Sequence, residues 1–254
     1  MMSPRGNSAP PTRCGGSCVD ADGTATTLKR RQAIREAVRQ SCVMRDHIAG
    51  TRAPMHVVGA GGLGKEVLDA LFAAGWKTDE IVLVDDRLRA EEVHGVPVRR
   101  PDQANRGSYV VAVGDPAVRR MLAERMSLRG LTPSAVVHPR ATLAHDVVPV
   151  EGCVILANAF VSTGVAMGPH SQVHYNATIG HDTLLREYVT VLPGANIAGS
   201  VLLDQAVTVG SNACVLQGLH VRATSFVGAG AVVTRDQPAG VTVVGVPARQ
   251  HRPD

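Results

Sequence analysis

The chain has 254 residues, 44% of them hydrophobic, and a formal net charge of +4 at pH 7. This length allows one or two domains, and an aromatic fraction of 3% leaves few rings to stack on bases, so nucleic-acid binding is excluded. Because no run of about 18 apolar residues and no apolar leader occurs, we expect a cytoplasmic protein that is not inserted in a membrane.

Residues 1–54 are rich in Ser, Gly, Pro, Thr and Arg and poor in large apolar side chains. Such a segment buries too little apolar surface to offset the entropy of ordering, so we expect a disordered extension. Cys14 and Cys18 lie here without a second pair of ligands, which does not favour a zinc site. Met55 directly precedes the first expected strand, and a start of translation there stays open.

Residues 55–136 begin with an expected strand (residues 55–59), a glycine-rich turn (60–64), a helix (65–74) and a second strand (80–85). Gly59, Gly61 and Gly64 form a G-x-G-x-x-G arrangement, and Asp85 follows at the end of the second strand. In a βαβ unit these glycines let a phosphate approach the helix N-terminus, where free N–H groups and the helix dipole favour anions. The pattern predicts a small Rossmann-like nucleotide-binding domain.

An acidic residue at the end of the second strand would contact a ribose hydroxyl, and Asp85 and Asp86 both stand there. One further strand (residues 110–114) and one further helix (residues 116–129) are expected before the pattern changes. This is half of a complete dinucleotide-binding fold, which suits one nucleotide better than two. We therefore favour nucleotide-sugar binding over nicotinamide binding.

From residue 137 the hydrophobic pattern has a strict period of six, which neither a strand nor a helix produces alone. The sixth-place residues run from Val137 to Val233, and only Pro149 is neither aliphatic nor Met. In a hexapeptide β-helix, each six-residue side of a triangular coil turns one large aliphatic and one small residue inward. The pattern therefore predicts such a prism in residues 137–254.

A small G-x-G-x-x-G domain joined to a hexad prism resembles the sialic acid O-acetyltransferase and UDP-amino-sugar (bacillosamine pathway) N-acetyltransferase family of hexapeptide-repeat acyltransferases. The resemblance implies a mixed fold, in which a small Rossmann-like α/β domain precedes an all-β, left-handed parallel β-helix. It also implies acetyl-CoA as co-substrate, a nucleotide-sugar or sugar acceptor, and a homotrimer with active sites between neighbouring prisms. The segments that carry it are Gly59–Val67, Val137–Pro139, Ile179–Asp182, Pro193–Gly199, Val227–Val233 and the capping segment Val244–Arg249.

By this resemblance, His181 takes the place of the family's general base and Asp182 the place of the acid beside it. An imidazole can accept the proton of an amine or hydroxyl as that group attacks a thioester. Asp182 would align the ring and stabilise the imidazolium that develops. Direct attack is expected, because Cys153 and Cys214 lie in apolar sequence surroundings, where a thiol is a poor nucleophile.

The resemblance further implies contacts to both substrates, with backbone N–H groups near Ala198 and Gly199 donating to the thioester oxygen. The chain departs from the family at Thr190 and Leu63, places where many members carry His. The candidate cofactor-binding residues are Thr190, Gly199, Ser211 and Ala229. The candidate substrate-binding residues are Gly61, Gly62, Leu63, Asp85, Asp86 and Gly114.

Three alternatives stay open. A γ-carbonic-anhydrase-like zinc enzyme would use His170, His174 and His181 as ligands, although the spacing does not favour it and we expect no metal. The chain could instead be a trimeric binder of sugar-nucleotides without catalysis, or an enzyme whose acceptor is a hydroxyl rather than an amine. Apart from the zinc alternative, we expect five histidines to be solvated: His138, His145, His170, His220 and His251.

Overall fold

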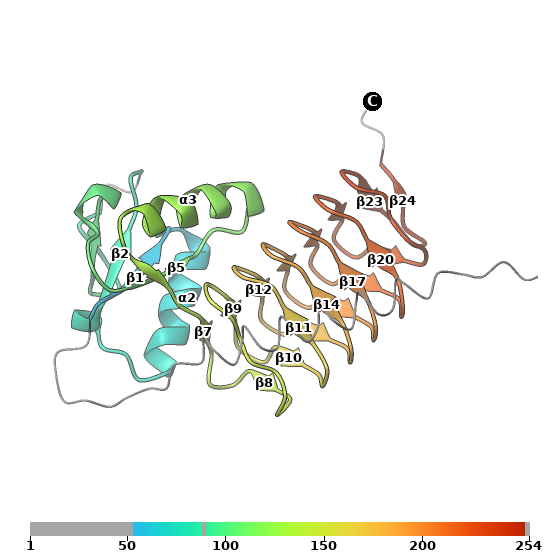
Figure 1. Cartoon of the computed structure of the whole chain (residues 1–254), viewed down its shortest axis with the longest axis horizontal. Helices are drawn as coiled ribbons and strands as arrows, with labels where there is room; N and C mark the ends of the chain where they lie inside the picture. The colour runs from blue at the N-terminus through green and yellow to red at the C-terminus, as the bar shows by residue number, and fades with distance from the viewer. Residues whose placement is uncertain (1–52, 88–89, 252–254) are drawn as a thin grey trace, which may run out of the picture.

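The computed structural model describes residues 53–87 and 90–251, so the expectation for the N-terminal extension lies almost entirely outside the described residues. The chain forms an α/β domain that lies beside the first coils of a long triangular prism (Figure 1). No helix within residues 53–87 and 90–251 is long and apolar enough to cross a membrane.

The α/β domain contains a six-stranded sheet in the order β3-β4-β2-β1-β5-β6. Neighbouring strands are parallel except β3 and β4, which pair antiparallel. Its elements are β1 (Met55–Val58), α2 (Gly62–Ala73), η1 (Thr78–Glu80), β2 (Ile81–Val84), β3 (Glu92–Val93), β4 (Val96–Arg99), η2 (Pro101–Gln103), β5 (Ser108–Val111), α3 (Pro116–Leu128) and β6 (Thr132–Pro133).

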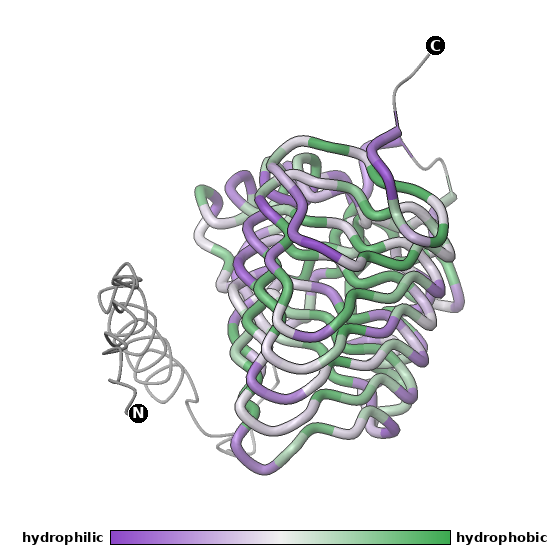
Figure 2. Tube along the Cα trace, turned by 90° about the vertical axis from the view of Figure 1, so that its right-hand side faces the viewer, coloured by the Kyte–Doolittle hydropathy of each residue, from purple (hydrophilic) through white to green (hydrophobic). Residues whose placement is uncertain are grey.

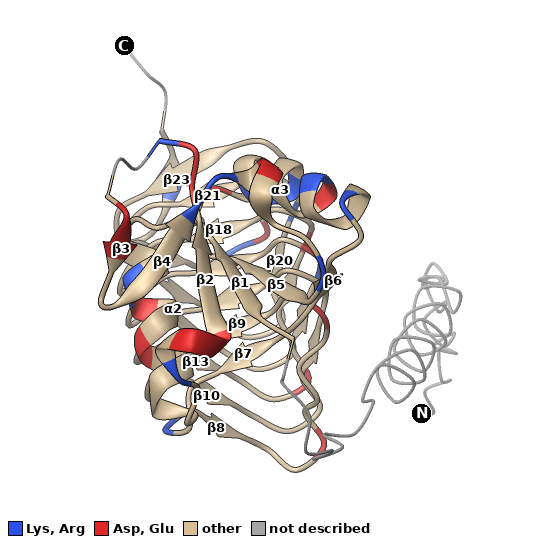
Figure 3. Ribbon diagram, turned by 90° about the vertical axis from the view of Figure 1, so that its left-hand side faces the viewer, with Lys and Arg blue, Asp and Glu red and all other residues tan. Residues whose placement is uncertain are grey.

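The two helices cover opposite faces of this sheet, because successive side chains of a strand point to opposite sides. Val57 and Leu83 pack in the cluster that contains α2, whereas Val58 and Val84 pack in the cluster that contains α3. Strands β1, β2 and β5 carry no charged residue, and the charges of this domain gather on the helices and the connections (Figure 3). A sheet buried on both faces requires such apolar strands.

The predicted elements of this domain are present, with two differences. Helix α2 begins at Gly62, three residues before the expected start at residue 65, so the glycine-rich turn is part of its first turn. Strands β3, β4 and β6 were not predicted, so the sheet is larger than the expected half of a dinucleotide-binding fold. Strands β4 and β6 each contain a proline, Pro97 and Pro133, which removes a donor from a sheet.

The prism consists of three sheets, in which each strand pairs with the strand 18 residues further along the chain, as Phe160 with Thr178 and Thr178 with Asn196. Three hexads therefore make one coil, as expected. The coil strands are β7 (Val136–Val137), β8 (Thr142–Leu143), β9 (Val154–Ile155), β10 (Phe160–Val161), β11 (Ala166–Met167), β12 (Gln172–Val173), β13 (Thr178–Ile179), β14 (Leu184–Leu185), β15 (Thr190–Val191), β16 (Asn196–Ile197), β17 (Leu202–Leu203), β18 (Thr208–Val209), β19 (Cys214–Val215), β20 (His220–Val221), β21 (Phe226–Val227) and β22 (Val232–Val233).

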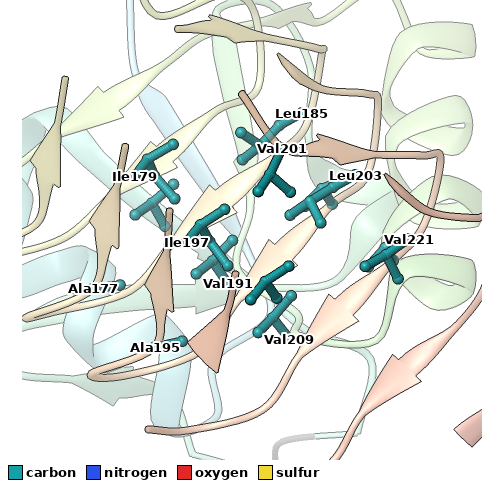
Figure 4. Packing of buried hydrophobic residues seen from close by; sticks show 14 of the residues in the cluster. Ala177, Ile179, Leu185, Val191, Ala195, Ile197, Val201, Leu203, Val209 and Val221 are labelled. Carbon is teal, nitrogen blue, oxygen red and sulfur yellow. The ribbon is translucent and has the colours of Figure 1, made fainter. Parts of the chain in front are cut away.

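The second residue of every coil strand is a residue of the predicted six-residue series, and these side chains form the inner core. Hydrophobic segments recur at the same place in coil after coil (Figure 2). In the close-up of the core, Ile179 and Ile197 lie one above the other, as do Val191 and Val209 (Figure 4). The sixth-place Pro149 lies in no strand, consistent with its missing N–H donor.

We call the three prism sheets first (β24-β23-β21-β18-β15-β12-β9-β7), second (β22-β19-β16-β13-β10-β8) and third (β11-β14-β17-β20). The first sheet ends with β23 (Thr242–Val244) and β24 (Arg249–Gln250), which pair antiparallel. This hairpin covers the end of the first sheet against further pairing. At the other end, Val136 of β7 packs into the core of the α/β domain, so the two units share apolar surface.

Candidate functional site

His181 stands at the corner between the second and third prism sheets, directly after β13 and before β14. The strand residue Ile179 points into the core, which leaves the corner residues two and three places later exposed to solvent. The His181 and Asp182 side chains are each 52% exposed, and His181 Nδ1 lies 3.0 Å from Asp182 Oδ2. The predicted pair is therefore formed.

Gly199 lies at the same place as His181 in the next coil, and its backbone supports the imidazole. A Cβ atom at this position would lie 2.4 Å from His181 Nε2, so only glycine leaves room for the ring in this orientation. Within the described residues, no acceptor bonds to the Gly199 N–H. The geometry therefore places a ring nitrogen of His181 beside a backbone N–H that has no acceptor among the described residues.

Ser211 and Ala229 lie at the other edge of the second sheet, at the corner between the first and second sheets. They occupy the same place in successive coils, and Gly230 N donates to Ser211 O at 2.9 Å. The structure does not bring these two candidate cofactor contacts together with His181 within one chain, because the whole width of the second sheet separates the two corners.

A cavity of about 430 Å³ opens at the carboxyl ends of β1, β2 and β5, beside the start of α2. This is where parallel sheets of this type bind ligands. Helix α2 has no side-chain cap at Gly61 and no acidic residue in its first turn, so its N-terminus is suited to an anion. The predicted residues that line the cavity are Gly61, Gly62, Leu63, Asp85 and Asp86.

Asp85 and Asp86 have different surroundings. Asp85 accepts hydrogen bonds from Ala60 N at 2.9 Å and from Arg87 N at 2.8 Å, so its carboxylate holds the glycine-rich turn in place. Asp86 is exposed, and its Oδ2 lies 3.6 Å from Arg125 Nη1. Of the two candidates for a ribose contact, Asp86 is the one turned toward solvent.

Thr190 and Gly114 correct the sequence-based expectation. Thr190 is completely buried, and its hydroxyl donates to Gly114 O at 3.2 Å and accepts from Arg119 Nη2 at 2.9 Å. Gly114 is not part of the cavity lining. Both residues lie in the contact between the α/β domain and the prism, because α3 packs over this part of the first sheet, and Thr190 is not available there to a cofactor.

One side of helix α3 also lines the cavity, although its residues were not among those predicted from the sequence. Val118 and Met121 are 40% and 57% exposed, which is unusual for apolar residues of a helix that packs on a sheet. The residues of this helix that line the cavity follow the spacing i, i+3, i+4 and i+7, which places them on one face of the helix. This spacing could have indicated the face from the sequence. The lining residues from this helix are Val118, Met121, Leu122 and Arg125.

The expectation that His170 is solvated was wrong. His170 is only 7% exposed, and its ring stacks between Tyr188 and Tyr109, at centroid distances of 5.1 and 6.2 Å. Burial lowers the pKa of His170 and the pKa of His174 to about 4. His220 also has a partner, because its Nε2 lies 2.7 Å from Asp204 Oδ2.

These positions bear on the zinc alternative. His170 and His174 are buried, so they are not available as ligands beside the exposed His181 at the surface of the prism. The part of the chain that the structure describes contains no group of three or more His, Cys, Asp or Glu side chains arranged to hold a metal ion. The positions of His170 and His174 therefore do not favour the zinc alternative.

The two cysteines of the prism differ from each other. Cys153 is completely buried, its Sγ donates to Gly168 O at 3.4 Å, and burial raises the pKa of its thiol to about 12. Cys214 precedes the inward Val215 in β19 and therefore points outward, where it is partly exposed. Of the two thiols, which were both expected in apolar surroundings, only that of Cys153 is buried.

Comparisons with known proteins agree with this arrangement. The family described as PglD N-terminal domain matches residues 55–126. GDP-perosamine N-acetyltransferase of Escherichia coli O157:H7 is 30% identical over 209 residues, which make up 76% of this chain and 94% of that protein.

Two solved structures are similar over most of the chain. The acetyltransferase domain of PglB from Neisseria gonorrhoeae FA1090, in complex with acetyl coenzyme A, has a TM-score of 0.72 and 33% identity, and the match covers 79% of this chain and 100% of that chain. A variant of perosamine N-acetyltransferase from Caulobacter crescentus, in complex with CoA and GDP-perosamine, has a TM-score of 0.73 and 29% identity, with 79% and 98% covered.

These similarities extend across both units of the molecule, from the glycine-rich turn to the prism. They confirm the expected fold class, a small Rossmann-like domain followed by a left-handed parallel β-helix. The chain therefore belongs to the hexapeptide-repeat family of sugar acetyltransferases that includes GDP-perosamine N-acetyltransferase.

Proposed function

We propose that this chain transfers the acetyl group of acetyl-CoA to an amine of a nucleotide-linked sugar, with His181 as the general base. The observation that carries the proposal is the exposed His181–Asp182 pair, whose imidazole lies against the backbone of Gly199. An amine is favoured over a hydroxyl because the relatives that match both units of the chain are named N-acetyltransferases.

In this mechanism the two ring nitrogens of His181 have separate tasks. Nδ1–H donates to Asp182 Oδ2, which leaves a lone pair on Nε2. As the sugar nitrogen forms its bond to the acetyl carbonyl carbon, Nε2 takes up a proton from that nitrogen. When the carbon–sulfur bond breaks, the imidazolium gives this proton to the departing thiolate of CoA. Asp182 stabilises the positive ring between the two steps.

The negative charge that develops on the carbonyl oxygen needs a donor, and the Gly199 N–H beside the ring is suited to that task. A covalent acyl-enzyme is not required. The buried Cys153 cannot reach a substrate, and its raised pKa keeps the thiol protonated at neutral pH. This supports direct attack in a ternary complex.

We assign the nucleotide part of the acceptor to the cavity of the α/β domain. The first turn of α2 would face the phosphates, and the apolar residues Val118 and Met121 would contact the base. Asp86 and Arg125 at the same cavity supply polar groups for the ribose or the base. Nicotinamide dinucleotides are less favoured, because the relatives that match both units of the chain are named for nucleotide sugars.

We further propose that three chains assemble as a trimer. His181 and Gly199 lie at one edge of the second prism sheet, and Ser211 and Ala229 lie at its other edge. In a closed three-fold arrangement, opposite edges of neighbouring chains can meet, so that CoA contacts at Ser211 and Ala229 of one chain would face His181 of the next. The mass of the protein in solution tests this assembly.

A thiol-release assay tests the reaction. The protein is incubated with acetyl-CoA and a panel of UDP- and GDP-linked amino sugars, each matched with the corresponding hydroxy sugar. We expect thiol release, together with a product that is one acetyl group heavier, for an amino sugar. Transfer to hydroxy sugars alone would overturn the proposal of an amine acceptor and would identify the reaction as O-acetylation. Tight binding of NAD without a response to any nucleotide sugar would contradict the assignment of the cavity.

A further inference from the structure

Two polar residues on the outer face of the prism are completely buried. Gln172 of β12 and Thr190 of β15 are direct partners in neighbouring strands, and both side chains point outward from the first sheet. Outward positions of an isolated prism face water. Here the α/β domain covers them, and both side chains bond to it: Gln172 Nε2 donates to Val111 O at 3.0 Å and Thr190 Oγ1 donates to Gly114 O at 3.2 Å.

Arg119 of α3 completes this contact from the other side, and we call Arg119, Gln172 and Thr190 the interdomain cluster. Its guanidinium is fully buried and donates to both units at once. The acceptors in the α/β domain are Val113 O and Gly114 O, both at 2.9 Å. The acceptors in the prism are His170 O (2.9 Å), Gln172 Oε1 (3.1 Å), Tyr188 O (2.6 Å) and Thr190 Oγ1 (2.9 Å).

No carboxylate of the described residues lies within 4 Å of the Arg119 guanidinium. Burial lowers the pKa of Arg119 to about 10, so the group is still charged at neutral pH. Its charge is therefore stabilised by carbonyl, amide and hydroxyl oxygens that come from both units. Moving the units apart would remove the acceptors on one side and leave a buried cation partly unsatisfied, which is costly. The cluster thus favours one relative position of the two units.

This position joins the two parts of the proposed site. Val113 lines the nucleotide cavity, as do Val118 and Leu122, which flank Arg119 on α3. On the prism side, Gln172 begins the coil that contains His181, and Thr190 begins the next coil. The cluster therefore connects the wall of the cavity to the coil that carries the base.

We propose that Arg119 is a positioning residue that holds the nucleotide cavity at a fixed place relative to the coil carrying His181. The proposal rests on the function proposed above. Its consequence is that loss of the cluster leaves nucleotide binding intact but moves the sugar amine away from the base. A misplacement of about 1 Å can lower turnover by roughly 10²-fold.

The test compares Arg119→Lys and Thr190→Val with Arg129→Lys, a matched control directly after the same helix. Lysine keeps the charge but has three donors on one nitrogen, so it cannot reach both sets of acceptors as the planar guanidinium does. Arg129 lies outside the cluster and donates to Ala104 O (3.1 Å) and Asp102 O, which both belong to the α/β domain. The measurements are kcat, the KM of acetyl-CoA, the Kd of UDP and of GDP by calorimetry, and the melting temperature.

For Arg119→Lys we expect kcat to fall about tenfold or more, with the nucleotide Kd and the KM of acetyl-CoA within about twofold of wild type. Thr190→Val should give a smaller loss of kcat in the same direction, and Arg129→Lys should give none. Unchanged kcat in both cluster variants overturns the proposal. A parallel loss of nucleotide binding, acetyl-CoA binding and melting temperature also overturns it, because this indicates a purely structural role.

If the wild-type protein transfers no acetyl group to any sugar of the panel, the proposed function fails and the contact itself can still be tested. Amide hydrogen exchange at residues 113–115 and at 190 reports opening between the two units. Faster exchange in Arg119→Lys but not in Arg129→Lys supports the role of Arg119 in fixing the units. Equal exchange in both variants overturns it.

Discussion

At the scale of single residues, the proposed reaction depends on the imidazole of His181, whose Nδ1 is bonded to Asp182 and whose Nε2 faces Gly199. If Nε2 removes the acceptor's proton, His181→Ala should lower kcat by roughly 10²–10⁴-fold, the usual range for a positioned base. The KM of acetyl-CoA should change little, because the ring acts on the other substrate. Steady-state kinetics check this, and near-normal turnover of the variant at neutral pH would falsify the mechanism.

Asp182→Asn should cost less than His181→Ala, because the base stays in place and only its charged partner is lost. An amide at this position can still accept a hydrogen bond from Nδ1–H, but it stabilises the imidazolium less. We expect an intermediate kcat under the same conditions. If Asp182→Asn were more damaging than the removal of the ring, the assigned roles of the two residues would have to be exchanged.

The contact between Gly199 and the ring gives a second prediction. Gly199→Ala places a methyl group 2.4 Å from the present position of Nε2, so the imidazole must move. We expect a loss of kcat of roughly tenfold or more. A double variant checks the cause: in the His181→Ala background, Gly199→Ala should have almost no further effect. Independent, additive losses would show that Gly199 acts in another way.

At the scale of elements, two glycines at the start of α2 have different roles, one in ligand binding and one in folding. A Cβ atom at Gly61 would meet no atom within 4 Å, whereas one at Gly64 would lie 2.1 Å from Gly59 O. Gly61→Val should therefore fill the cavity and weaken the Kd of the nucleotide sugar, with the melting temperature and acetyl-CoA binding unchanged. Gly64→Val should instead destabilise the domain. Calorimetry and thermal unfolding check the pair, and unaltered binding by Gly61→Val would place the nucleotide elsewhere.

Elements also determine how far the sequence could predict the structure. Each coil strand needs one inward aliphatic residue per hexad, which is a local requirement, so the register from Val137 to Val233 could be read directly. The exposed corner of His181 follows from the same register. The register does not predict the burial of Thr190. That burial depends on Arg119 of α3, which lies 71 residues away along the chain.

The same limit explains the other differences in the site. His170 occupies a corner, where side chains of an isolated prism are solvated, and only the rings of Tyr109 and Tyr188 from two different units make it a buried residue. The structural role of Asp85 could not be predicted either, because its carboxylate accepts a hydrogen bond from Ala60 N and this contact depends on the conformation of the glycine-rich turn. A local pattern specifies strands and turns, but it does not specify which surface another unit covers.

At the scale of the whole molecule, the contact between the two units contains two neutral histidines, and this predicts acid sensitivity. The pKa of His170 and the pKa of His174 are lowered to about 4 by burial and by the nearby charge of Arg119. In the unfolded chain a histidine titrates near pH 6.5. Between pH 6.5 and about 4 the unfolded state therefore binds more protons than the folded state, and the free energy of unfolding falls as the pH falls.

The expected slope is roughly 1.4 kcal/mol per pH unit for each histidine within this range. His174→Leu tests the origin of the effect, because Leu156 and Leu192 occupy the same place in the coils before and after. This variant should keep more of its stability at pH 4.5 than wild type. Denaturant unfolding at pH 7.5, 5.5 and 4.5 measures the difference. A His174→Leu protein with the same loss of stability on acidification as wild type would show that the protons bind elsewhere.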